Sequence, residues 1–175
     1  YQPTLAMADA TRHWHIHKMT PPSNAEDMFL VIGNTGIHAP TGKQVAKVAD
    51  MLLQDPSRMK EIDTIGQIAR RGIEALKEGD FDRVGRTMTE NQLMLSSIGV
   101  SSPELDNLIK AASPSSLGAK LTGAGGGGCM VALTKKPKET SDAIELAGGR
   151  TLISRLGSSG LSIDDSQNAP LWTKA

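Results

Sequence analysis

The feature that most constrains this chain is a run of glycines between two apolar segments. Five of the six residues from Gly123 to Gly128, here called the glycine loop, are glycine, and the loop separates Gly118–Thr122 from Cys129–Thr134. Both flanking segments have the length and the apolar residues of strands. A hairpin needs only one or two residues with positive φ, and each further glycine costs backbone entropy. The loop therefore indicates a hairpin that is closely approached by a second backbone or by a ligand, with a flexible connection as the plainer alternative.

The glycine loop also matches part of a nucleotide-binding motif. The spacing Gly123-x-Gly125-x-x-Gly128 is that of a dinucleotide fingerprint, which requires a helix to begin at the loop. Here the loop continues into Met130–Leu133, which predicts a strand, so this interpretation is disfavoured. No Gly-Lys-Ser/Thr follows, which excludes a Walker A loop. Consecutive free N–H groups can nevertheless form a concave site for an anion.

The rest of the chain predicts strands and helices in a definite order. The expected strands, in chain order, are 29–32, 118–122, 129–134 and 150–154, with short additional ones at 13–17 and 160–164. Apolar residues at helical spacing predict helices over 41–53, 56–78, 81–98, 103–109 and 137–147. Asp55, Asp80 and Ser102 precede three of these helices as expected N-caps.

This order, a strand followed by several helices and then strand, strand, helix and strand, is typical of an α+β domain. We expect a ferredoxin-like sandwich, in which a mostly antiparallel sheet carries helices on one face. The length of 175 residues allows one ordinary domain. The domain is assigned to residues 28–164, with a weakly patterned lead-in over 1–27 and a polar tail over 165–175. Because the chain begins at Tyr1 rather than Met, we expect it to be a piece of a longer protein.

The composition narrows the class of partner. Lys and Arg number 19 and Asp and Glu number 19, so the formal net charge is zero, whereas nucleic-acid-binding and membrane-surface proteins are usually basic. No stretch is apolar for long enough to span a membrane, and no signal peptide is recognisable. The single cysteine, Cys129, excludes an internal disulfide and fits a reducing cytosol. We therefore expect a cytoplasmic protein without nucleic-acid or membrane partners.

Three stretches resemble the GHMP small-molecule kinases and, within them, the mevalonate kinase family. Lys120–Cys129 is similar almost letter for letter to that family's C-terminal glycine-rich motif. Val31–Gly36, followed by Thr41, is similar to its strand-turn-helix near the substrate. Asn91–Leu93, with Gly99–Ser101 after it, resembles a helix pair of the family. The stretches keep the family's order along most of the chain, which argues against a chance likeness.

The resemblance implies the C-terminal domain of an ATP- and Mg²⁺-dependent phosphotransferase. In this family the γ-phosphoryl group of ATP passes to the 5-hydroxyl of mevalonate, in isoprenoid precursor synthesis. The family's N-terminal phosphate loop and its catalytic aspartate and lysine match no residue of this chain, so no catalytic residue is expected here. The resemblance implies instead an N-terminal domain before residue 1 and an isolated chain without activity. Another GHMP kinase, acting on phosphomevalonate, homoserine or a sugar, and a non-catalytic binding or assembly module stay open as alternatives.

The resemblance also implies which residues meet the ligands. The residues expected beside the phosphates, at the interdomain cleft, are Gly123, Gly125, Gly126, Gly127 and Gly128. Ala124 is implied to lie close to mevalonate. Thr41 matches the family threonine near mevalonate, whose hydroxyl could bond a substrate oxygen; the alternative is that Thr41 only caps the helix that follows.

Other polar residues carry further predictions. His13, His15 and His17 share one face if the segment is extended, but no carboxylate or cysteine lies near them in sequence, so we expect a solvated edge strand and no bound metal. Cys129 is expected to be a small core residue, and Asn91 to hydrogen-bond a loop in the core. Apolar surface left for the N-terminal domain could also allow self-association into a homodimer.

Overall fold

The computed structural model describes residues 22–157. The helices are α1 (Thr41–Gln54), α2 (Met59–Glu78), α3 (Phe81–Ser97), α4 (Pro103–Ala112) and α5 (Pro137–Leu146). The strands are β1 (Phe29–Asn34), β2 (Gly118–Thr122), β3 (Cys129–Thr134) and β4 (Arg150–Arg155). Short 3₁₀ turns occupy Ser23–Asp27, Pro56–Arg58 and Ser113–Ser115. The strands expected at 13–17 and 160–164, and the tail over 165–175, lie outside the described residues.

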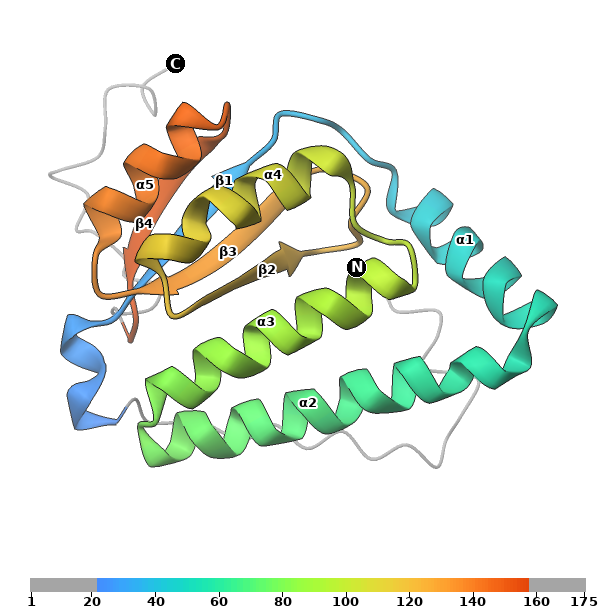
Figure 1. Ribbon diagram of the computed structural model, residues 1–175, viewed down its shortest axis with the longest axis horizontal. Helices are drawn as coiled ribbons and strands as arrows, with labels where there is room; N and C mark the ends of the chain where they lie inside the picture. The colour runs from blue at the N-terminus through green and yellow to red at the C-terminus, as the bar shows by residue number, and fades with distance from the viewer. Residues whose placement is uncertain (1–21, 158–175) are drawn as a thin grey trace, which may run out of the picture.

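The four described strands form one antiparallel sheet in the order β2-β3-β1-β4. Helices α4 and α5 lie side by side over the same face of this sheet (Figure 1). Helices α2 and α3 form a hairpin that runs beside β2 (Figure 1). The predicted α+β sandwich, with an antiparallel sheet and helices on one face, is confirmed.

The main core lies between the sheet and helices α4 and α5. Val31 of β1 pairs with Ala132 of β3, and residues paired in an antiparallel ladder have side chains on the same face. Both residues are fully buried, as are Leu105 of α4 and Ile144 of α5 in the same cluster. The alternation of apolar residues along the strands thus fixes which face the helices cover.

The helix ends follow signals in the sequence. The Asp55 carboxylate accepts hydrogen bonds from the hydroxyl and the N–H of Ser57, at 2.6 and 3.0 Å, and these bonds lower the pKa of Asp55 below its ordinary value. A 3₁₀ turn follows before α2 begins. Gly79, with a φ of +73°, ends α2, and the Asp80 carboxylate accepts the Arg83 N–H at the start of α3. Asp80 is thus confirmed as the cap of α3, and Ser102 caps α4 as predicted, whereas Asp55 caps the 3₁₀ turn and not α2, which begins three residues later than predicted and has no side-chain cap.

Helix α3 packs directly against the free edge of β2. A Cβ added at Gly85 would lie 2.2 Å from the Leu117 carbonyl oxygen, and one added at Gly118 would lie 1.9 Å from the Gly85 carbonyl oxygen. Glycine at both positions is what permits this approach. The Gln92 Oε1 atom accepts the Leu121 N–H at 2.8 Å, which satisfies a donor on the strand edge. Two glycines and one glutamine therefore join the helical hairpin to the sheet.

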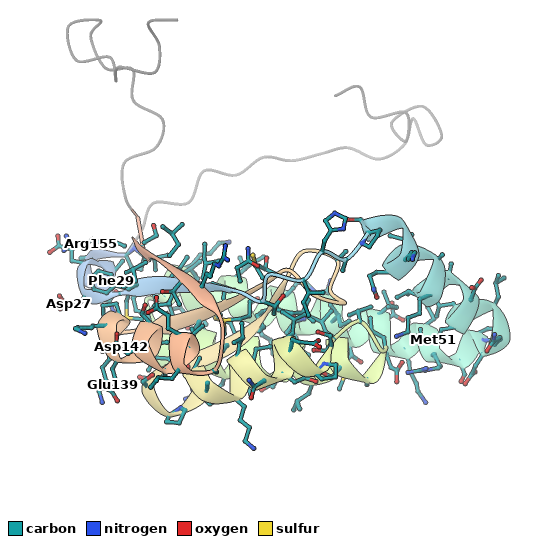
Figure 2. All side chains as sticks on the ribbon, turned by 90° about the horizontal axis from the view of Figure 1, so that it is seen from above. Asp27, Phe29, Met51, Glu139, Asp142 and Arg155 are labelled. Carbon is teal, nitrogen blue, oxygen red and sulfur yellow. The ribbon has the colours of Figure 1, made fainter. Side chains whose placement is uncertain are left out.

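Helix α1 lies at the margin of the main core, against which its partly buried Val48 and Met51 pack. No residue of α1 is buried, and the side chain of Leu53 is 80% exposed. Figure 2 shows Met51 of α1 at the opposite end of the molecule from Phe29 and Arg155. Phe29 and Arg155 face each other across β1 and β4, with the guanidinium carbon 5.7 Å from the ring centre. None of the helices in residues 22–157 combines the length and the apolar character needed to cross a bilayer.

Gly85 provides a test of the contact between α3 and β2. We predict that Gly85→Ala lowers the free energy of unfolding by about 1–3 kcal/mol, because the new Cβ overlaps the Leu117 carbonyl. Gly66→Ala, inside α2, is the matched control, since its Cβ would meet only Arg70 Nη1, at 3.8 Å. The control gains up to about 1 kcal/mol from helix propensity. Urea unfolding followed by circular dichroism measures both variants, and equal effects would contradict the close packing.

Candidate functional site

The glycine loop connects β2 to β3 and is anchored by main-chain hydrogen bonds to two other segments. The Gly126 N–H donates to the Val100 carbonyl at 2.8 Å, in the turn before α4. The Gly128 N–H donates to the Ile37 carbonyl at 2.9 Å, in the segment after β1. The Gly128 carbonyl accepts hydrogen bonds from the N–H and the hydroxyl of Thr35, at 2.9 and 3.0 Å. The loop is therefore held in place from both sides.

The same two segments explain why glycine is needed at several loop positions. A Cβ added at Gly125 would lie 1.9 Å from the Val100 carbonyl oxygen, and one added at Gly127 would lie 2.8 Å from the Ile37 carbonyl oxygen. Gly125 also has a φ of +83°, in the left-handed region that other residues rarely adopt. Of the two predicted causes of the glycine run, another backbone or a ligand, the close approach of a backbone is confirmed, and that backbone belongs to Val100 and Ile37.

The glycine loop lines a cleft of about 340 Å³. The lining residues are Ala39, Thr41, Thr122, Gly123, Ala124, Gly125, Gly127, Gly128 and Cys129. The fold thus brings Thr41, at the start of α1, to the same cleft as Ala124 and the loop. Gly126 is the predicted site residue that does not line the cleft. A Cβ there would lie 2.1 Å from Gln44 Nε2, so Gly126 packs against α1 instead.

Three main-chain N–H groups of the loop have no acceptor in the part of the chain that the structure describes. They belong to Gly123, Ala124 and Gly127, all of which line the cleft, whereas the Gly125 N–H closes the turn over Gly123 and Ala124. Successive N–H groups of this kind attract negatively charged oxygens. The N-terminus of α1, at Thr41, adds a partial positive charge to the same cleft. The cleft is thus chemically suited to an anionic ligand.

Thr41 is the first residue of α1, and it is exposed. Pro40 occupies the N-cap position, and no side chain makes a capping hydrogen bond to this helix. The alternative that Thr41 serves only as a helix cap is therefore wrong. Among residues 22–157 the Thr41 hydroxyl has no hydrogen-bond partner, so it is available to a ligand in the cleft.

Ala124 lies between the cleft and a second cavity of about 390 Å³. The second cavity has an almost wholly apolar lining, made by Gln44, Val45, Val48, Ala49, Leu52, Val100 and Ala124. This cavity separates part of α1 from the turn that anchors the loop. Because Ala124 borders both spaces, a larger side chain at this position would narrow both.

The residue that sequence reasoning missed is Gln92. Gln92 is 6% exposed, and its Oε1 atom accepts the Leu121 N–H just before the glycine loop. Its Nε2 atom donates to Ser101 Oγ at 3.1 Å and to Asp106 Oδ1 at 3.3 Å. The sequence did contain a signal, because the polar pair Asn91-Gln92 interrupts an apolar stripe. The sequence analysis assigns the buried hydrogen bond to Asn91, whereas Gln92 makes it.

Two predictions about polar residues are therefore corrected. The Asn91 side chain makes no hydrogen bond within residues 22–157 and lines a groove between α2 and α3. Successive residues of a helix are turned about 100° from each other, so the neighbours Asn91 and Gln92 face different surroundings. Cys129 is a free, half-buried cysteine that lines the cleft at the start of β3, rather than a core residue.

Lys120 is the cation next to the glycine loop in sequence, but it does not line the cleft. It lines the groove between α2 and α3, and its Nζ donates to the Leu121 carbonyl at 2.6 Å. Burial lowers the pKa of Lys120 below its ordinary value, because a partly buried ammonium loses hydration. The positive charge of Lys120 therefore lies in the groove between α2 and α3 and not in the cleft.

The described residues supply no ligand set for a metal ion. Within residues 22–157, no three side chains of His, Cys, Asp or Glu gather closely enough to form one. The lining of the cleft contains no carboxylate, so the Mg²⁺ that the resemblance implies has no charged side-chain ligand there. His13, His15 and His17 lie outside the described residues.

Comparison with known proteins agrees with this geometry. Residues 73–151 match the family model described as GHMP kinases C terminal. The chain carries a GHMP kinase C-terminal domain. The mevalonate kinase of Pyrococcus furiosus is 37% identical over 147 residues, which cover 79% of this chain and 44% of that protein. The mevalonate kinase of Thermococcus gammatolerans is 34% identical over 171 residues, which cover 93% of this chain and 51% of that protein.

A solved structure is also similar to this GHMP kinase domain. It is the crystal structure of L. major mevalonate kinase in complex with R-mevalonate, with a TM-score of 0.62 and 37% sequence identity. The match covers 69% of this chain and 37% of that one. The chain thus spans about half the length, or less, of the relatives it matches.

Two loop glycines test the anchoring separately from backbone strain. Gly123 and Gly125 have φ of +82° and +83°, but a Cβ at Gly123 would meet nothing within 4 Å, whereas one at Gly125 would overlap the Val100 carbonyl. We predict that Gly123→Ala costs about 1–2 kcal/mol of unfolding free energy from the left-handed conformation alone. Gly125→Ala should cost clearly more. Chemical denaturation measures both, and equal losses would contradict the contact between Gly125 and Val100.

Proposed function

We propose that this GHMP kinase domain belongs to a mevalonate kinase, which transfers the γ-phosphoryl group of ATP to the 5-hydroxyl of mevalonate in isoprenoid precursor synthesis. The observation that carries the proposal is the joint placement of Thr41, Ala124 and the unpaired loop N–H groups in one cleft. Relatives named mevalonate kinase, at 34% and 37% identity, support this choice of substrate.

The loop supplies positioning and charge stabilisation. Phosphoryl transfer depends mainly on holding the reacting groups in line and on stabilising negative charge on the phosphoryl oxygens. The unpaired N–H groups of Gly123, Ala124 and Gly127 are suited to that second task. When bound, ATP would supply the phosphoryl group and Mg²⁺ would offset its negative charge.

Thr41 and Ala124 are proposed to contact mevalonate. The free Thr41 hydroxyl can donate a hydrogen bond to a mevalonate oxygen or accept one. The mevalonate carboxylate is favoured near the N-terminus of α1, where the helix dipole is positive. The small Ala124 side chain lets the carbon skeleton of mevalonate lie against the loop.

The acid–base groups are proposed to come from a preceding domain, because the family's catalytic aspartate and lysine match no residue of this chain. The protein that contains the chain would act in the cytoplasm. The exposed apolar side chains of α1, Val45 and Leu53, provide surface for that domain or for a homodimer.

The substrate is tested on the full-length protein that contains this chain. ADP release is measured with mevalonate, phosphomevalonate, homoserine and a sugar panel at equal concentrations. We predict the highest kcat/KM for mevalonate. A clear preference for any other alcohol would overturn the substrate assignment, and no turnover with any of them would favour a binding module.

The Thr41 hydroxyl is tested by two substitutions in the same protein. Thr41→Val removes the hydroxyl at nearly constant shape and is predicted to raise the KM for mevalonate about 3- to 10-fold, the value of one hydrogen bond. The KM for ATP should stay close to that of the wild type. Thr41→Ser, which keeps the hydroxyl, is the control. An unchanged KM for mevalonate in Thr41→Val would remove Thr41 from the substrate site.

The 175-residue chain alone is predicted to show no mevalonate-dependent ATP turnover, because it lacks matches to the family's catalytic groups. A coupled assay for ADP release checks this, with the full-length protein as the positive control. Robust turnover by the isolated chain would contradict the placement of the catalytic groups in another domain.

A further inference from the structure

One buried side chain links the two backbone segments that determine the shape of the glycine loop. Gln92, in the middle of α3, accepts the Leu121 N–H at 2.8 Å through Oε1. Leu121 lies two residues before the loop, on the edge of β2 that α3 covers. Gln92 therefore holds the strand that leads into the loop.

The other end of the same amide reaches the turn that anchors the loop. Gln92 Nε2 lies 3.1 Å from Ser101 Oγ and 3.3 Å from Asp106 Oδ1, and Ser101 Oγ donates to the same Asp106 oxygen at 2.6 Å. Ser101 directly follows Val100, whose carbonyl accepts the Gly126 N–H. The position of that carbonyl is thus tied to Gln92.

The Val100 carbonyl cannot move far without disturbing the glycine loop. Its carbonyl oxygen bonds Gly126 at 2.8 Å and lies where a Cβ at Gly125 would be only 1.9 Å away. Val100 also borders the apolar cavity that it shares with Ala124. A shift of the Ser101 turn would therefore reach both the loop and the residue proposed to contact the substrate.

We propose that Gln92 is a positioning residue for the glycine loop, acting through Leu121 and Val100 without touching the substrate. The proposal rests on the proposed function for its effect on turnover. Its structural part, the coupling of Gln92 to the loop, stands on the hydrogen bonds alone. The competing account is that Gln92 only stabilises the fold.

The test is Gln92→Glu in the full-length protein. Glutamate keeps the size of the side chain and an acceptor for the Leu121 N–H, but it loses the donor and puts a second carboxylate beside Asp106. We expect kcat/KM for mevalonate to fall about 10- to 100-fold, the cost of misplacing a substrate-positioning element by about 1 Å. We also expect the amide resonance of Gly126 to shift in protein labelled with ¹⁵N-glycine.

Two further variants make the result specific. In the double variant Gln92→Glu with Asp106→Asn, the amide at position 106 can donate to the carboxylate at position 92, so a hydrogen bond joins the two side chains again. This variant should restore most of kcat/KM and the Gly126 resonance. Asn91→Asp is the matched control, because it makes the same amide-to-carboxylate change one residue earlier, where no hydrogen bond is lost. It should leave both readouts at wild-type values.

The outcomes separate the two accounts. If Gln92→Glu lowers only the unfolding midpoint and leaves kcat/KM and the Gly126 resonance unchanged, the positioning role is wrong. If Gln92→Glu does not fold, Ser101→Ala removes one bond of the same group and should shift the Gly126 resonance; an unchanged resonance overturns the proposal. If the protein does not phosphorylate mevalonate, the proposed function fails, and the Gly126 resonance still decides the coupling.

Discussion

Two main-chain hydrogen bonds, from Gly126 to Val100 and from Gly128 to Ile37, give this domain its functional shape. They join the β2–β3 hairpin to the turn before α4 and to the segment after β1. Backbone groups can approach this closely only because the loop lacks side chains at Gly125 and Gly127. With these bonds made, the N–H groups of Gly123, Ala124 and Gly127 have no acceptor among residues 22–157, and all three residues line the cleft. The glycine run thus serves two purposes: it allows the close backbone packing, and it leaves N–H groups free in the cleft.

The rest of the fold places the segments that meet at this loop. The core between the sheet and helices α4 and α5 fixes β1 and β3, so the segment after β1 passes the loop. The close contact of Gly85 with Gly118 brings α3 against β2, and this places Gln92 within reach of Leu121. Helix α1 then begins at the cleft with Thr41. The shape of the cleft therefore depends on packing contacts that lie well away from it.

Much of this could be predicted from the sequence, because it depends on local signals. The bounds of β2 and β3 follow from apolar runs that glycines interrupt, and Asp80 caps α3 as its position before an amphipathic stripe indicates. The number of glycines also predicted that a backbone or a ligand comes close to the loop. The identity of that backbone depends on tertiary packing, so neither Val100 nor Ile37 could be named. For the same reason Gln92 was missed, since the rotation of α3 against β2 decides which of two adjacent amides is buried.

Hydrogen exchange of the loop amides, measured residue by residue by NMR, tests the central claim most directly. The account predicts slow exchange at Gly126 and Gly128, whose N–H groups are bonded, and fast exchange at Gly127 between them, whose N–H group has no acceptor among residues 22–157. Uniformly fast exchange from Gly123 to Gly128 would contradict it, because the loop would then be a flexible connection without anchoring bonds.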